Sequence, residues 1–259
     1  MNNEYGFNIG LAVQCDGDKY HILKNKVRAC YMYKRGIFIE ECKHRFLCMV
    51  NVEGTEELCH ICSSSKLERF ISLKGREVIL TPNIGKNSRT RYTLYAVKTE
   101  EGFVLLNLNY VNKILFQEFS KSENPYSKAG EIFCEKKISN KLKADFFIDG
   151  TRKIIIEAKG IISEEQTALL PSMKVDRAVR QLKQFELLLK QGFDVHYYVV
   201  LLSNNITRIE LDKGNKEFYR IFRRCIKKGM SIFVYRTMWK GDMCAVEPSS
   251  YMEESLRQT

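Results

Sequence analysis

The 259-residue sequence lacks any long uninterrupted run of apolar residues. A membrane-spanning helix needs about 20 such residues in succession, so we expect no membrane span. The opening stretch MNNEYGFNIGLAVQ also lacks the basic start and long apolar core of a secretory signal peptide. No internal repeat and no low-complexity segment is found. We therefore expect a globular protein that stays in the cytoplasm.

Disulfide frameworks are not favoured either. The chain has nine cysteines, an odd number, and no export signal accompanies them. Disulfides persist mainly in oxidising compartments. We interpret the cysteines as reduced thiols of a cytoplasmic protein.

Acidic residues are fewer than basic ones: the chain has 31 Asp and Glu but 42 Lys and Arg, which gives a formal net charge of +11. Such an excess favours a polyanionic partner, nucleic acid first and an anionic membrane surface second. We expect nucleic acid, with DNA ahead of RNA, and no membrane partner. Nothing in the sequence indicates an oligomeric state.

The residues that are present describe a soluble globular chain, with 44% hydrophobic and 28% charged residues. The length allows two modest domains or one large one. The first half contains short strand-like runs, including REVILTP and RYTLYAV, that are bounded by Pro, Asn, Gly and Ser. This spacing predicts a small barrel or sandwich.

The second half has a different pattern. It predicts a helix, three strands (EIFCEKKI, ADFFIDG and KIIIEAKG), a helix ended by Gly192, a strand, a helix and a last strand. That order is typical of an α/β layered domain with a mixed sheet. We place the boundary near Lys98–Gly102. The expected division is an unplaced segment at 1–29, a barrel domain at 30–100 and a second domain at 101–259.

An acidic and basic constellation lies on two of these strands. Glu157 and Lys159 are two residues apart and so point to the same face of a strand. Asp145 lies on the preceding strand, and the turn DGT predicts a hairpin that could bring it close. Two neighbouring carboxylates are best satisfied by a hard divalent cation such as Mg²⁺. The alternative is a solvated salt bridge at a strand end.

An acid followed by acid-x-Lys at the end of an apolar strand resembles the motif of the restriction-endonuclease-like (PD-(D/E)XK) nucleases. Over about Tyr33 to Tyr235 the chain also resembles the sugar fermentation stimulation protein (SfsA) family. The resemblance is carried by RGIFIEECKHRFLCMVNVEG, CHICSSSKL, NSRTRYTLYAV, LLNLNYVN, KADFFI, IIIEAKG, LLPSMKVDRAVRQLKQF and GFDVHYYVVLLS.

This resemblance implies an N-terminal OB-like β-barrel followed by a C-terminal restriction-endonuclease-like domain with a mixed sheet. It also implies DNA binding and metal-dependent nuclease activity. Asp145 and Glu157 would hold Mg²⁺ or Mn²⁺, and Lys159 would position the attacking water. Glu135 matches an acidic position of the family and is a candidate further ligand; Glu118 is a weaker one.

The sequence departs from the family pattern in places. Gln181 stands where the family has His on the following helix, and Phe185 follows it by four residues, as in related nucleases. We expect Gln181 to support the site, with Arg177 contacting nucleic acid; the alternative for Gln181 is a plain helix surface. Ser63 replaces a family Asn, which leaves the role of its loop open. The segment up to about Ala29 has no counterpart.

The cysteine-rich stretch of the first half permits a zinc interpretation. Cys59 and Cys62 form a Cys-x-x-Cys with His60 between them, and Cys42 and Cys48 precede them. Structural zinc usually draws on two such pairs, but the spacing of Cys42 and Cys48 is too wide for the usual knuckle. We therefore favour buried thiols.

Basic residues suggest where nucleic acid would lie. Arg220, Arg223, Arg224 and Lys227 recur at spacings of three and four on the last predicted helix, so they share one stripe. The stripe is either a solvated face or a phosphate-contacting ridge. In the barrel half the candidates for extending such a track are Arg69, Lys74, Arg89 and Arg91, with Tyr92 or Tyr95 stacking on bases.

The sequence thus predicts a Mg²⁺- or Mn²⁺-dependent nuclease acting on DNA or RNA. The alternative is a non-catalytic DNA-binding regulatory protein linked to sugar metabolism genes.

Overall fold

Short strands with alternating burial form the first domain. The computed structural model describes residues 13–16, 19–22, 33–43, 46–63, 65–83, 88–172, 175–250 and 256. In the second strand of this domain Cys48, Val50 and Val52 point inward and are buried, while the residues between them are partly exposed. The elements of the domain are β3 (Lys34–Glu41), β4 (Leu47–Val52), β5 (Thr55–His60), η1 (Leu67–Arg69), β6 (Glu77–Pro82), β7 (Tyr92–Thr99) and β8 (Gly102–Leu105).

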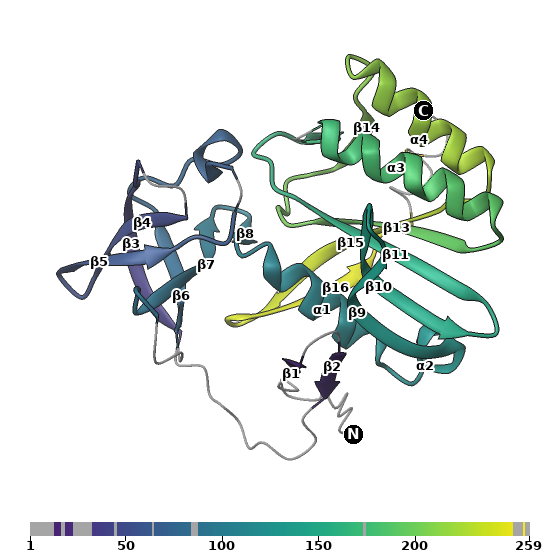
Figure 1. Cartoon of the computed structure of the whole chain (residues 1–259). Coiled ribbons are helices and arrows are strands. Elements are labelled where there is room, and N and C mark those ends of the chain that lie inside the picture. The colour runs from purple at the N-terminus through teal and green to yellow at the C-terminus, as the bar shows by residue number, and fades with distance from the viewer. Residues whose placement is uncertain are drawn as a thin grey trace, which may run out of the picture.

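These strands close into a barrel (Figure 1, left). The hydrogen-bonded order is β5-β4-β3-β6-β7, and β7 then pairs in parallel with the end of β5 through Cys59↔Tyr92 and His60↔Thr93. Five strands are therefore joined without a free edge, which confirms the predicted OB-like barrel. The stretch Lys98–Gly102 contains the end of β7, a two-residue turn and the start of β8, and β8 pairs with β7 beside the barrel.

The second domain is built on a six-stranded mixed sheet in the order β16-β15-β13-β11-β10-β9. The pairs β11–β13 and β13–β15 are parallel, and the others are antiparallel. Parallel neighbours need a crossover connection, and α3 and α4 supply the two crossovers. The elements are α1 (Asn109–Phe119), α2 (Tyr126–Ala129), β9 (Gly130–Ser139), β10 (Leu142–Gly150), β11 (Lys153–Ile161), β12 (Thr167–Leu170), α3 (Val175–Lys190), β13 (Asp194–Leu201), β14 (Arg208–Leu211), α4 (Lys216–Lys227), β15 (Ser231–Lys240) and β16 (Met243–Pro248).

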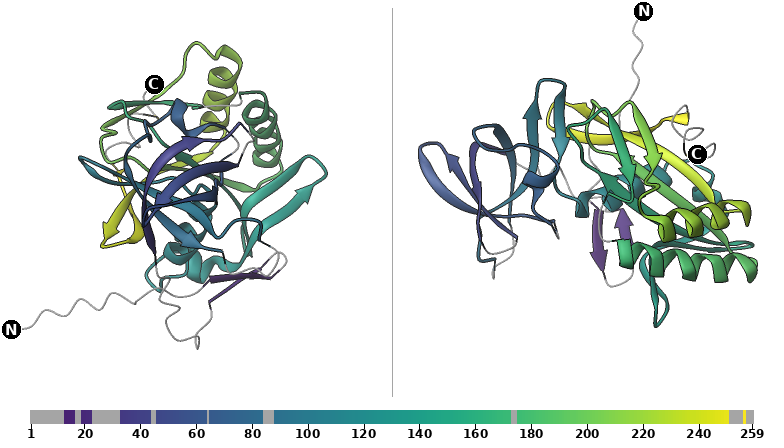
Figure 2. Two further views of the ribbon diagram at one scale, coloured as in Figure 1. Left: turned by 90° about the vertical axis from the view of Figure 1, so that its left-hand side faces the viewer. Right: turned by 90° about the horizontal axis from the view of Figure 1, so that it is seen from above.

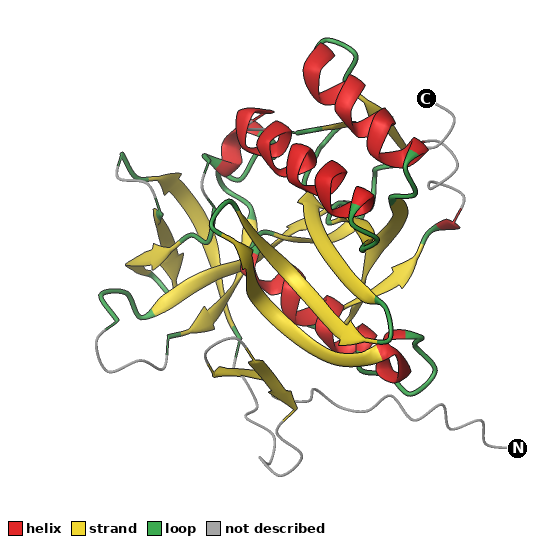
Figure 3. Cartoon of the chain, turned by 45° about the vertical axis from the view of Figure 1, so that its right-hand side comes forward, coloured by secondary structure: helices red, strands yellow, loops and turns green. Residues whose placement is uncertain are grey.

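Helices cover both faces of this sheet (Figures 1 and 3). On one face α3 and α4 lie side by side, and Leu182, Phe185 and Phe222 are buried in the core beneath them. On the other face α1 buries Ile114 and Leu115. The predicted end of α3 is confirmed, since Gly192 follows it with a φ of 85°, which favours glycine.

Several elements were not anticipated from the sequence. They are α2, β16 and a small parallel pair formed by β12 and β14. A backbone hairpin of β1 (Val13–Asp16) and β2 (Lys19–Ile22) lies within the segment that had no counterpart, and β2 lies beside β9. Within the described ranges, no helix combines the length and apolar character needed to cross a membrane.

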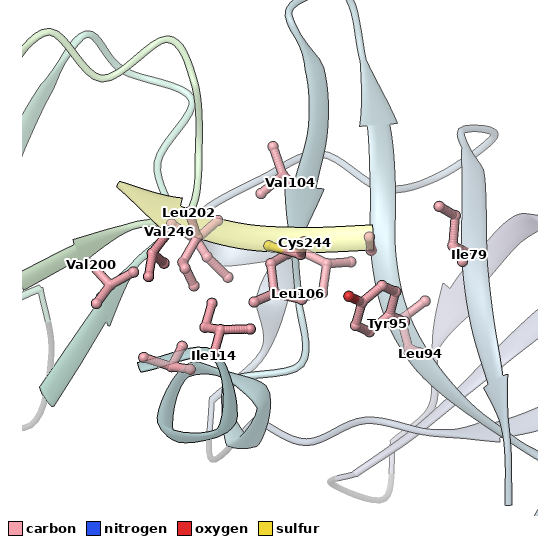
Figure 4. Packing of buried hydrophobic residues seen from close by; sticks show 14 of the residues in the cluster. Ile79, Leu94, Tyr95, Val104, Leu106, Ile114, Val200, Leu202, Cys244 and Val246 are labelled. Carbon is pink, nitrogen blue, oxygen red and sulfur yellow. The ribbon is translucent and has the colours of Figure 1, made fainter. Parts of the chain in front are cut away.

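The two domains share one hydrophobic core. Tyr95 of β7 is fully buried and makes edge contacts with Tyr110 of α1 and Trp239 of β15. Figure 4 shows Tyr95 beside Leu106 and Cys244, with Val246 and Val200 continuing the cluster into the second domain.

Polar contacts reinforce this junction, which Figure 2 shows from two further directions. Arg35 of the barrel donates to Asp242 at 2.8 Å. Glu164, just after β11, accepts from the Ser72 amide at 3.0 Å and from Arg76 at 2.8 Å. The barrel therefore contacts the segment that directly follows the strand of Glu157 and Lys159.

Candidate active site

The β10–β11 hairpin brings Asp145 next to Glu157, as the sequence predicts. The two strands pair from Asp149↔Lys153 up to Phe146↔Ile156. Asp145 and Glu157 are the next residues along each strand. Beyond that pair, Asp145 Oδ2 accepts a 2.8 Å hydrogen bond from the Ala158 backbone amide. The Asp145 side chain is thereby fixed at the point where regular strand pairing ends.

Glu157 and Lys159 form an ion pair within the sheet, in which the Lys159 ammonium donates to Glu157 Oε1. The second oxygen, Oε2, is buried and has no hydrogen-bond partner among the described residues. Burial and the neighbouring Asp145 carboxylate raise the pKa of Glu157 to about 7. The ion pair with Lys159 therefore compensates one oxygen of this buried carboxylate and leaves the other, Oε2, without the partner that a buried acid normally finds.

Asp145 and Lys159 are shifted by the same environment. Burial raises the pKa of Asp145, although the Lys159 ammonium and the Ala158 amide oppose that rise. Burial alone would lower the pKa of Lys159, but Glu157, Tyr197 and Asp145 outweigh it and keep the ammonium charged. The site therefore places two carboxyl groups with raised pKa values beside one lysine that stays charged. Perturbed pKa values of this kind often cluster at functional sites.

Asn112, which the sequence analysis did not select, joins two acids of the site. Its side-chain amide donates to Glu135 Oε1 at 3.1 Å and to Asp145 Oδ1 at 3.3 Å. Glu135 lies on β9 with a φ of 55°, which is uncommon for a residue other than glycine. Its other oxygen pairs with Lys143 at 2.7 Å. Glu135 thus lies in the outer part of the same cluster.

Gln181 reaches the site from α3. Its side chain hydrogen-bonds the Glu157 carboxylate, and this bond opposes the rise of the Glu157 pKa. Phe185, four residues on, is fully buried beneath the helix. Tyr197, paired with Glu157 across the parallel strands, is a further neighbour that sequence reasoning missed. Burial raises its pKa, and the nearby Lys159 works against that rise.

These residues fit a hard divalent cation. Asp145 and Glu157 adjoin, the pKa of each is raised even though Lys159 lies beside them, and Glu157 Oε2 has no hydrogen-bond partner in the part of the chain that the structure describes. Protein Mg²⁺ sites often use one or two carboxylates, with water and substrate phosphate completing the shell. Among the described residues, no three His, Cys, Asp or Glu side chains are placed together as a ready-made metal cage.

Other predicted residues lie elsewhere. Glu118, near the end of α1, pairs with Lys121 just beyond the helix, at 2.6 Å. Ser63 is buried and donates to the backbone oxygen of Ser65. Arg177 is exposed in the first turn of α3, one turn before Gln181 and on the same side of the helix.

The cysteines of the cysteine-rich stretch lie in the barrel core and beside His60. Cys48 and Cys59 are directly paired across β4 and β5 and are fully buried. Cys62 instead contacts His60, with 3.5 Å between Sγ and Nδ1. No disulfide joins the cysteines whose side chains the structure describes, and whether this stretch binds zinc stays open.

The basic ridge on α4 is only partly available. Arg220 and Lys227 are exposed, and Arg223 is half-buried. Arg224 makes a two-pronged ion pair with Glu186 of α3, at 3.1 and 2.9 Å. We therefore expect Arg224 to contribute less to phosphate contact than the sequence suggests, because its guanidinium already joins two helices.

In the barrel half, Arg69, Lys74 and Arg89 are exposed. Arg91 donates to Glu57 at 2.8 Å and lies over the Tyr92 ring.

The expectation that Tyr92 or Tyr95 stacks on bases is wrong for this structure. Tyr95 is fully buried at the domain junction, and Tyr92 is only 9% exposed. A base needs an open aromatic face, and neither ring offers one.

Comparison with known proteins gives a consistent result. A family model described as the SfsA N-terminal OB domain matches residues 42–106. A second, the sugar fermentation stimulation protein RE domain, matches residues 109–243.

Sequence relatives cover most of the chain. A sugar fermentation stimulation protein homolog of Thermotoga petrophila is 29% identical over 225 residues, covering 85% of this chain and 95% of the relative. A homolog from Ruminiclostridium cellulolyticum is 25% identical over 202 residues, covering 77% and 88%.

A solved structure of Pyrococcus furiosus SfsA, described as a complex with Ca²⁺, has a TM-score of 0.69 and 18% identity, and the match covers 83% of this chain and 93% of that one. At that identity the likeness shows the fold. Together, the two family models cover the barrel apart from β3 and most of the second domain. The chain belongs to the sugar fermentation stimulation protein (SfsA) family.

Proposed function

We propose that this chain is a divalent-metal-dependent nuclease that hydrolyses phosphodiester bonds of nucleic acid. One observation carries the proposal: Asp145 and Glu157 adjoin in a buried site, one Glu157 oxygen has no partner among the described residues, and the charged Lys159 lies beside them. Burying acids in this way is costly for a purely structural strand end. It is useful where a cation and a phosphate bind together.

Asp145 and Glu157 would hold Mg²⁺ or Mn²⁺, with Glu135 on the outer side of the cluster. The bound ion would supply positive charge that stabilises the phosphate in the transition state. The Ca²⁺ in the description of Pyrococcus furiosus SfsA supports this choice, because Ca²⁺ and Mg²⁺ both prefer oxygen ligands.

The remaining residues have roles that follow from their positions. Lys159 holds an ammonium beside Glu157, where it can orient a water and balance charge on the phosphate. Asn112 and the Ala158 amide fix the orientation of Asp145. Gln181 supports Glu157, and the exposed Arg177 one turn earlier can contact a phosphate of the bound strand.

The test is to incubate the purified protein with labelled single- and double-stranded DNA and RNA, in Mg²⁺, Mn²⁺ or EDTA. We expect cleavage with a divalent ion, none in EDTA, and none by Glu157→Gln. Glu118→Gln is the matched control, because Glu118 pairs with Lys121 away from the site.

The same test addresses the rival function, a non-catalytic DNA-binding regulatory protein. Binding without cleavage in every metal would favour that rival. Cleavage by Glu157→Gln at the wild-type rate would show that the activity comes from another site or from a contaminant.

A further inference from the structure

A basic hairpin extends from the acidic cluster, between two of the residues that form it. From Glu135 on β9 to Asp145 on β10, the chain carries lysines and no further acid. We call residues 136–144 the basic arm, and its lysines are Lys136, Lys137, Lys141 and Lys143. The proposed chemistry uses the two acids at the base of the arm and gives the arm itself no role.

The basic arm is a two-stranded ribbon that continues past the regular sheet. Within the described ranges, β10 pairs with β11 as far as Phe146, whereas its pairing with β9 runs on to Leu142. The teal hairpin at the bottom of the right-hand view of Figure 2 projects from the rest of the molecule. Leu142 and Ala144 are buried in the core beneath α3 and α4. The arm is therefore anchored along one face and open along the other.

The lysines of the arm share its open face with the acids at its base. Side chains alternate along a strand, so Lys143 points away from the buried Leu142 and Ala144. Lys137 is directly opposite Lys143 and points the same way. The ion pair of Lys143 with Glu135, at 2.7 Å, places Glu135 on that face too. The basic face therefore begins directly at the acidic cluster.

The arrangement of these lysines favours an anionic partner. Like charges directly opposite each other on paired strands repel and destabilise the pair. Glu135 offsets the charge of Lys143. Among the described residues, however, no acid pairs with Lys137 or Lys141, and both lysines are exposed. A polyanion bound along the arm would supply the negative charge that this face lacks.

We propose that the basic arm lies in the major groove of double-stranded DNA, with its lysines against the phosphates that border the groove. The major groove of B-form DNA, about 12 Å wide, admits a two-stranded β-ribbon. The major groove of double-stranded RNA is too deep and narrow for side chains to enter, and a single strand has no groove. The arm therefore selects duplex DNA by shape and charge. Cleavage of that duplex rests on the proposed nuclease function; the groove binding does not.

The length of the arm determines where it meets the duplex. A strand rises about 3.3 Å per residue, so Lys137 lies about 7 Å from Glu135 along the ribbon and the tip of the arm about 13 Å. Each DNA strand carries one phosphate for about every 3.4 Å of helix axis. With the ribbon along the groove, the lysines therefore reach phosphates about two to four nucleotides from the one at the acids.

The test measures equilibrium binding of the full chain to one duplex DNA and to the duplex RNA of the same sequence. A salt series in EDTA gives the slope of log affinity against log salt while no cleavage occurs. Lys137→Ala/Lys141→Ala should lower the slope for duplex DNA by about 1.8, because two phosphates lose their cations. The slope for duplex RNA should keep its wild-type value.

Two further variants serve as controls. Lys137→Arg/Lys141→Arg keeps both charges and should bind duplex DNA with the wild-type slope, because contact with phosphates does not depend on base sequence. Lys128→Ala/Lys153→Ala removes two exposed lysines at the opposite end of the same strands, before β9 and at the start of β11. This variant has the same net charge as the double alanine variant of the arm, and it should leave both slopes unchanged.

The results separate this proposal from the nuclease. If Lys137→Ala/Lys141→Ala lowers the slope for duplex DNA in a protein that never cleaves, the arm stands and the nuclease does not. If it binds duplex DNA with the wild-type slope, the arm is overturned, whatever the cleavage result. An equal loss with duplex RNA would also overturn it, since the arm would then attract any polyanion. Thermal unfolding guards against a folding defect: removing Lys137 relieves the repulsion with Lys143, so the variant should unfold no earlier than wild type.

Discussion

The Ala158 backbone amide donates a 2.8 Å hydrogen bond to Oδ2 of Asp145, just past the last regular pair of strands β10 and β11. At this position the Asp145 side chain accepts the hydrogen bond that a backbone carbonyl of β10 would accept in a regular pair of strands. The carboxylate is thereby held in one orientation before any ligand arrives. How far the site relies on this fixed arrangement can be measured.

Asn112→Ala should weaken divalent-ion binding by about tenfold or more. Its amide donates to Asp145 and Glu135, and removing a hydrogen bond that supports a metal ligand typically costs 10- to 100-fold in metal affinity. Calorimetry with Mn²⁺ can compare it with wild type and with Asp145→Asn, which should bind most weakly. Asn83→Ala, in the barrel, is the control for the removal of a partly buried, hydrogen-bonded amide. Equal affinity in Asp145→Asn and wild type would remove Asp145 from the metal site.

Lys159→Ala should slow cleavage about a hundredfold or more while changing affinity only modestly. A preplaced cation at the developing charge contributes roughly 3 kcal/mol to the transition state, which corresponds to that change in rate. Lys159→Arg should rescue poorly, because the forked guanidinium cannot take the place of a compact ammonium. Single-turnover rates beside equilibrium binding measure both quantities. Wild-type cleavage by Lys159→Ala would contradict the assigned role.

The metal-free protein should lose stability as the pH rises from about 4.5 to about 7. The pKa of Glu157 is raised to about 7 from an ordinary 4.5, so in this interval the folded state binds more protons than the unfolded chain. The free energy of unfolding is therefore highest below this interval, and it falls by up to about 3 kcal/mol once the pH has risen above it. Urea unfolding in EDTA across this range should show a flatter profile for Glu157→Gln than for wild type and Glu118→Gln. Identical slopes in all three proteins would contradict the raised pKa.

Nucleic-acid affinity should fall steeply with salt, and the basic residues of α4 should contribute unequally. Arg220 and Lys227 are exposed, whereas Arg224 is committed to Glu186. Replacing Arg220 and Lys227 with Ala should flatten the plot of log affinity against log salt by about 0.7 to 0.9 for each phosphate that the protein no longer neutralises. Arg224→Ala should leave the slope nearly unchanged. If neither the double replacement of Arg220 and Lys227 nor Arg224→Ala changes the slope, the basic stripe of α4 is a solvated face.

Much of the fold was readable from the sequence because local patterns determine it. The DGT turn between two apolar runs predicts the β10–β11 hairpin, and the 3.6-residue periodicity with Gly192 predicts α3. The parallel pair β12–β14 was missed because each strand has only four residues and is defined by a partner about forty residues away. Such pairing depends on tertiary structure and leaves little local signal.

The candidate site was predicted in the same uneven way. Asp145, Glu157 and Lys159 could be found because one hairpin carries all three. Asn112 could not, since an amide on a helix carries no signal for the strands it will face. Spacing on α4 marked Arg224 as a surface cation, but its partner Glu186 lies on another helix.

The junction around Tyr95 and Trp239 also determines how the chain can be divided. Although the two family modules are separate in sequence, their apolar surfaces cover one another. Cutting the chain between Leu106 and Asn109 would leave these rings in water, where exposed patches promote aggregation. Expressing the two halves separately should give poorly soluble fragments, whereas co-expression should allow the two fragments to associate.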